Sequence, residues 1–280
     1  PLAMAWIGDA VPYERRQPVL ARFLIGHMLG IAASTSAAGW LGERYGWRAI
    51  FVALAGLYVL TAGLLWFELR ANPATRQVAG ARESMAASFL RMLRLTGIPW
   101  VRVILAIVFL EGALFYGPLA FAAYHAHRQL GLGIAASGML MAAFAAGGLL
   151  YAGVAGQLVP RLGERGLVLA GGLFLCAGYA GLALAPGPGA AVPCLLALGV
   201  GLYMLHNTLQ LHATQMAPES RGAAVALFAF CLFTGQSAGV WLASHAIDAL
   251  GTLPVFAVAA AGLPVLALEF RRRLAAHRLT

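Results

Sequence analysis

The chain has 280 residues, of which 61% are hydrophobic and 10% are charged, and its mean hydropathy is +0.81. Soluble domains carry about 25% charged residues, so this composition excludes an ordinary soluble domain. The net charge of +9 comes from arginines. They lie in short segments between apolar runs, which favours orientation in a lipid bilayer over binding to nucleic acid.

Continuous apolar runs of about 20 residues recur along the chain, and this length crosses a bilayer core. The runs lack the period-two alternation of strands, so the sequence predicts an all-α, polytopic membrane bundle. Residues 1–10 are too short to span and are expected to form a partial helix. Eight full spans are expected at about 19–41, 49–69, 101–124, 134–156, 166–185, 192–215, 222–245 and 252–270.

The longest polar segment covers residues 70–98. Its part from 82 to 95 separates apolar side chains from arginines on a helix, which predicts an interfacial helix. Sixteen of the 19 arginines lie in one alternate set of connecting segments, which includes 70–98 and the C-terminal tail. The positive-inside rule therefore places the C-terminus in the cytoplasm. The opposite set holds Arg44, Arg48 and Arg128.

An internal repeat appears at an offset of 205 residues. Glu14 and Arg16 align with Glu219 and Arg221, each pair in a turn that follows an apolar helix. Both copies continue with a helix of small residues, a short loop and another apolar helix. Repeats of this kind are typical of transporters built from two halves of six helices. The four charges are candidate gating residues.

Residues 156–166 read GQLVPRLGERG. The segment resembles the second copy of the loop motif G-x-L-x-D-R-x-G-R-R of the major facilitator superfamily of secondary transporters. Pro160 stands where the motif has its acid, and Glu164 stands where it has the first of two closing basic residues. The matching positions are Gly156, Leu158, Arg161, Gly163 and Arg165.

The segment from 20 to 48 resembles the fifth helix and the following G-W-R of the drug-efflux branch, although its glycine-proline and double-glycine positions are changed. Small residues recur here every fourth position, which predicts a flat seam for close helix contact. They are Gly26, Gly30, Ser34, Ala38 and Gly42.

The resemblance implies that the chain comprises the end of family helix four and helices five to twelve. Residues 1–69 would then belong to the N-terminal bundle, 70–98 to the central cytoplasmic loop, and 99–280 to the C-terminal six-helix bundle. About three and a half family helices lie upstream of this register and Pro1 is not an initiator methionine, so a fragment of a longer protein is expected.

The family's charge relay is expected to be incomplete in this chain. In the family, the acid at the end of helix four, here Asp9, pairs with an arginine of the first loop motif. Thr214 and Pro160 replace the two acids of the C-terminal relay. Gating by that latch is therefore not expected in the C-terminal half.

Glu111 is the sharpest candidate functional residue. It lies about eleven residues into a span, roughly 15 Å deep at the rise of an α-helix. An ionised carboxylate is costly at that depth, so the group can exist protonated, which suits proton coupling or cation binding. The alternative is a protonated glutamate that bonds a neighbouring helix for structure.

A stripe of hydrogen-bonding side chains recurs at helical spacing in the span 192–215. Its members are Tyr203, His206, Asn207 and Gln210. They could line a substrate pathway, with His206 titrating, or they could bond neighbouring helices. Tyr116, near Glu111, and Gln236 are further pathway candidates.

No catalytic constellation appears in the sequence: G-x-S-x-G, H-E-x-x-H and Walker patterns are absent. We therefore expect no enzyme, no cofactor and no metal. His125 and His127 are expected in a solvated external loop rather than in a metal site, because nothing nearby supplies further ligands. The three cysteines lie in separate apolar segments and are expected to be buried, without disulfides.

The resemblance implies a secondary transporter of a small organic solute. The favoured expectation is proton-coupled export (antiport) by alternating access, in a bacterial cytoplasmic (inner) membrane, with Glu111 as proton carrier. A facilitator or importer on the same fold is the first alternative, because the fifth-helix motif is changed. A non-transporting receptor and an inactive truncated fragment remain open.

Overall fold

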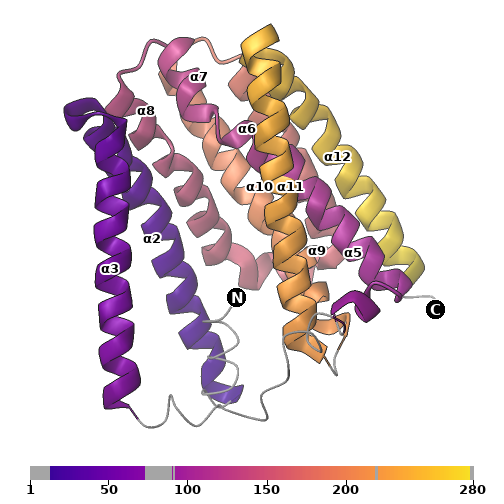
Figure 1. Cartoon of the computed structure of the whole chain (residues 1–280). Coiled ribbons are helices and arrows are strands. Elements are labelled where there is room, and N and C mark those ends of the chain that lie inside the picture. Colours follow the sequence, from indigo (N-terminus) through magenta and orange to yellow (C-terminus); the bar gives the residue numbers. More distant parts are fainter. Residues whose placement is uncertain (1–12, 73–89, 91, 218–219, 278–280) are drawn as a thin grey trace.

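The computed structural model describes residues 13–72, 90, 92–217 and 220–277. Every regular element in these ranges is a helix, which confirms the all-α prediction (Figure 1). Six of the described helical stretches are long and apolar enough to cross a membrane. The predicted partial helix at 1–10 and most of the predicted interfacial helix at 82–95 fall outside the described residues.

Helices α2 (Tyr13–Tyr45) and α3 (Trp47–Ala71) form an antiparallel pair (Figure 1). They are joined at Gly46, whose φ of 80° is a conformation that glycine adopts without a steric penalty. α3 has no buried residue, and its extensive contacts are with α2. α2 also packs against α8 (Ile134–Leu140) and α9 (Ala142–Ala183), so it joins the pair to the rest of the bundle.

The contact between α2 and α8 depends on a close backbone approach. A Cβ atom on Gly39 would lie 3.1 Å from the carbonyl oxygen of Ala135. One helical turn further along α2, the Glu43 carboxylate accepts a 2.8 Å hydrogen bond from the Ala135 N–H at the start of α8. No atom of the described residues lies within 4 Å of a Cβ built on Gly26 or Gly30, so within the described part of the chain the close contact of α2 is made at Gly39 instead of at these two seam positions.

α9 contains two membrane spans. Its 42 residues would measure about 63 Å as one straight helix, twice the thickness of a bilayer core. The backbone leaves the helical conformation at Gly163 (φ 61°, ψ 174°). On either side of this break, Gly147 packs against Gly199 and Gly178 packs against Leu198, so both halves flank the same part of α10 (Pro188–Gln215). The chain therefore doubles back at Gly163, between the two predicted spans.

The stretch that begins at Pro99 is divided into four helical pieces. α5 (Pro99–Glu111) is followed by a π-helical turn, η2 (Gly112–Tyr116), and then by α6 (Gly117–Leu119) and α7 (Ala122–Arg128). α11 (Arg221–Leu250) packs along α5, η2 and α6. Glycines allow this approach, because a Cβ on Gly235 or Gly239 would overlap a carbonyl oxygen of the facing backbone.

α12 (Thr252–His277) follows α11 after a turn at Gly251 and packs mainly on α9. Figure 1 shows α5 and α9 to α12 gathered beside the α2–α3 pair. Their buried apolar side chains form one large core, which includes Val101, Ile104, Leu175, Leu195, Leu205, Phe256 and Phe270.

Candidate functional site

The structure brings Glu111 and His206 into direct contact. His206 Nδ1 lies 2.8 Å from Glu111 Oε2, which joins the end of α5 to the middle of α10 across 95 residues of sequence. The Glu111 side chain is fully buried, whereas 14% of the His206 side chain is exposed. Glu111 Oε1 has no hydrogen-bond partner in the described part of the chain. The pair is a buried, titratable centre whose more accessible member is the imidazole.

A π-helical turn begins directly after Glu111. Such turns are rare and often occur at functional sites, because the extra residue in the turn changes which side chains share a face. Here the turn ends at Tyr116, whose phenol interacts electrostatically with Glu111 and with Tyr203. Tyr179 of α9 donates a 2.5 Å hydrogen bond to the carbonyl oxygen of Phe115 and so ties the turn to its neighbour.

The predicted polar stripe lies beside the most buried face of α10, which carries Leu202, Leu205 and Leu209. Tyr203, His206, Asn207 and Gln210 are all partly buried. Asn207 forms a side-chain hydrogen bond with Tyr151 of α9. Asn207 and His206 both contact neighbouring helices, as one of the two expected roles requires, whereas the lining of a substrate pathway stays a prediction.

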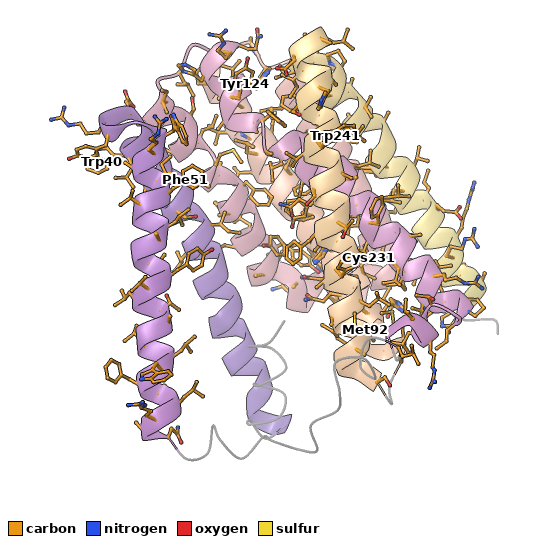
Figure 2. The ribbon with its side chains drawn as sticks, viewed as in Figure 1. Trp40, Phe51, Met92, Tyr124, Cys231 and Trp241 are labelled. Atoms are coloured by element: carbon orange, nitrogen blue, oxygen red, sulfur yellow. The ribbon has the colours of Figure 1, made fainter. Side chains whose placement is uncertain are left out.

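A cavity of about 630 Å³ lies between α2 and the helices α6, α7 and α8. Tyr116 and Gln236 both line it, so two residues singled out in the sequence meet in one space. Tyr124, which Figure 2 labels, and His127 contribute further polar groups, and most of the remaining wall is apolar. Tyr116 is thus shared between the cavity and the Glu111–His206 pair.

The loop motif forms the reversal of α9. Gly163 supplies the positive φ, and Gly156, Arg161 and Arg165 lie exposed on either side of it. The structure also shows a contact that the sequence did not predict: Glu164 Oε2 lies 3.4 Å from His212 Nε2 on α10. His212 lies two residues before Thr214, the position aligned with the relay acid.

The prediction of a solvated loop at His125 and His127 is wrong for His125. Both residues are helical, in α7. His125 is buried and shares a 2.7 Å hydrogen bond with Thr252 Oγ1 at the start of α12, because α7 packs against that helix end. His127 is exposed, and its Nδ1–H donates to the carbonyl oxygen of Leu132.

The side chains of the predicted gating residues all lie outside the described set. Asp9 and Glu219 lie outside the described residues. Glu14 and Arg16 fall in α2 and Arg221 begins α11, but their side chains are also outside the described set. Across the described ranges, no group of three or more histidine, cysteine or acidic residues could hold a metal ion, and the three cysteines are free and half-buried.

These features define a multi-pass helical membrane protein with a buried acid–imidazole pair and an open cavity between its helices. The family model of the Major Facilitator Superfamily matches residues 1–240, so the chain belongs to this family.

Three relatives are transport or resistance proteins by name. The chloramphenicol resistance protein of Streptomyces lividans is 28% identical over 279 residues, covering 96% of this chain and 69% of that protein. YwtG of Bacillus subtilis (strain 168), named for metabolite transport, is 31% identical over 118 residues, which cover 41% of this chain and 26% of that protein. The inner membrane transport protein YdhP of Escherichia coli (strain K12) is 33% identical over 86 residues, which cover 31% of this chain and 21% of YdhP.

Proposed function

We propose that the protein is a secondary active transporter that exports a small organic solute in exchange for protons. The carrying observation is the fully buried Glu111, bonded at 2.8 Å to a partly exposed histidine. A titratable acid within a membrane span is expensive and is expected to serve function. Membership of the Major Facilitator Superfamily and the names of its relatives support transport.

The pair can take up one proton and keep its hydrogen bond. With one shared proton it carries a net charge of −1, because the neutral imidazole Nδ1–H donates to the carboxylate. A second proton makes the pair neutral, as imidazolium with carboxylate or as imidazole with carboxylic acid. Glu111 Oε1 is buried and has no partner in the described ranges.

Tyr116 links the Glu111–His206 pair to the cavity proposed to hold the solute. Its phenol interacts with Glu111 and also lines the 630 Å³ cavity. A change in the charge of Glu111 would therefore act on a side chain in the wall of the proposed solute site. This is the differential contact that coupling between two sites requires.

The cavity has the size of sites that hold drug-sized molecules, about 300–1,000 Å³. Chloramphenicol is the first solute to test, because a relative that aligns with 96% of this chain is named for resistance to it.

The proposal also covers location and mechanism. We propose that the protein lies in a bacterial cytoplasmic membrane with its C-terminus in the cytoplasm, has no enzymatic activity, and works by alternating access of two helical bundles.

Transport is tested with purified protein in liposomes. With an acidic lumen, we expect the wild-type protein to accumulate labelled chloramphenicol, and a protonophore to abolish the accumulation. Glu111→Gln should lose this gradient-driven accumulation but retain exchange of labelled for unlabelled solute, which needs no net proton movement.

Glu269→Gln is the matched control, because Glu269 is exposed and paired with Arg273 on α12. It should behave as wild type. Full accumulation by Glu111→Gln and by Glu111→Ala would remove Glu111 from the mechanism. Wild-type flux that ignores the proton gradient would select the facilitator or importer, which the changed fifth-helix motif favours.

A further inference from the structure

A second cavity, of about 340 Å³, lies where α12 ends beside the reversal of α9. Three arginines line it: Arg165 from α9, and Arg271 and Arg272 from α12. The remaining wall comes from Leu268 and Ala275. This cavity is lined by none of the residues of the Glu111–His206 pair or of the 630 Å³ cavity.

The packing of α9 against α12 explains why these arginines converge. Gly172 of α9 lets the helices touch, since a Cβ there would overlap the Ala267 side chain. Arg165 lies two turns before Gly172, and Arg271 lies one turn after Ala267. Because this half of α9 and α12 run in opposite directions from that contact, both arginines reach the same end of the bundle.

The charges of the cavity are not balanced by neighbouring acids. The adjacent Arg273 forms an ion pair with Glu269, at 2.7 Å from Nε to Oε1. No salt bridge joins Arg165, Arg271 or Arg272 to an acid in the described ranges. Three like charges around one small cavity repel each other, and an anion between them would remove that cost.

We propose that this cavity binds the phosphate group of an anionic phospholipid. Guanidinium groups match phosphate oxygens with paired, charge-assisted hydrogen bonds. Basic pockets between helices at a membrane surface are suited to such headgroups. Leu268, which is 42% exposed on the same wall, supplies an apolar surface for the start of the acyl chains. A free phosphate ion offers the same oxygen atoms to the arginines but has no acyl chain that could pack on that surface.

Lipid binding is measured by native mass spectrometry of the purified protein in detergent, titrated with phosphatidylglycerol or with phosphatidylcholine. We expect wild type to bind phosphatidylglycerol at least about tenfold more tightly. Each surface arginine contributes roughly a fivefold factor to binding of anionic lipid. Arg165→Gln should therefore weaken binding about fivefold, and the combined R165Q, R271Q and R272Q variant about a hundredfold.

Arg273→Gln is the matched control, since it removes one charge from the same helix end but not from the cavity wall. It should bind as wild type does. Equal losses in R273Q and R165Q, or no preference over phosphatidylcholine, would overturn the proposal. Displacement of phosphatidylglycerol by millimolar inorganic phosphate would assign the cavity to free phosphate and overturn the proposal of a lipid site. Transport of chloramphenicol is a separate readout, so the two proposals fail independently.

Discussion

Replacing His206 by leucine removes the hydrogen-bond partner of Glu111 Oε2 and leaves both carboxyl oxygens without a partner in the described structure. Hydrogen bonds to charged groups contribute about 1.5–3 kcal/mol in proteins. Bonds between membrane helices average about 0.6 kcal/mol and reach about 1.7. Because Glu111 is fully buried, we expect His206→Leu to lower the free energy of unfolding by about 1.5 kcal/mol.

A double-mutant cycle isolates the pair. Glu111→Leu should also destabilise, but His206→Leu should cost little more once the carboxyl group is gone. The coupling free energy should therefore be about 1–1.5 kcal/mol, which is about tenfold in the equilibrium constant for unfolding. The measurement is unfolding of the purified protein by dodecyl sulfate in mixed micelles, followed by circular dichroism. Additivity of the two substitutions within about 0.3 kcal/mol would refute the argument, since groups that share a bond cannot be independent.

Three further predictions concern helix packing at the π-helical turn, the reversal of α9 at Gly163, and the hydrogen bond of Tyr179. Gly239→Ala should destabilise by at least about 2 kcal/mol in the same assay, because the new methyl would overlap the π-turn backbone; Gly156→Ala, in open space, is its control. Gly163→Ala should cost about 1–2 kcal/mol through its φ of 61°, and a neutral result would contradict the reversal. Tyr179→Phe should cost about 1 kcal/mol by removing the hydrogen bond to Phe115, with faster hydrogen exchange at the turn; unchanged exchange would show that the bond does not hold it.

The burial of Glu111 inside a long apolar helix could be predicted from the sequence, because the acid stands in the middle of an apolar run. That the stripe residues of α10 share one partly buried face could be predicted too, since helical spacing alone places Tyr203 and Gln210 together. The contact between Glu111 and His206 could not be predicted. The relative rotation of α5 and α10 depends on glycine contacts with other helices, which no local pattern encodes.

Two local features had weak signals. The π-helical turn follows Glu111 in the sequence GALFYGP, where Gly112 and Gly117 allow α11 to approach, but the same residues also fit an ordinary helix. The Glu164–His212 contact could not be predicted, because the family motif has a basic residue at the position of Glu164. An acid in the turn and a histidine on the packed helix are complementary, yet their spacing of 48 residues carries no periodic signal.

The attachment of α2 and α3 has a mechanical consequence. Since α3 contacts mainly α2, a tilt of α2 would carry both helices together as one lever. The joint against α8 includes close backbone packing at Gly39 and a hydrogen bond from Ala135 to Glu43, and α2 also packs on α9. Separating such a joint costs a few kcal/mol. A solute in the adjoining cavity can drive such a tilt only through the difference in its affinity for the two positions of α2, and a thousandfold difference corresponds to about 4 kcal/mol.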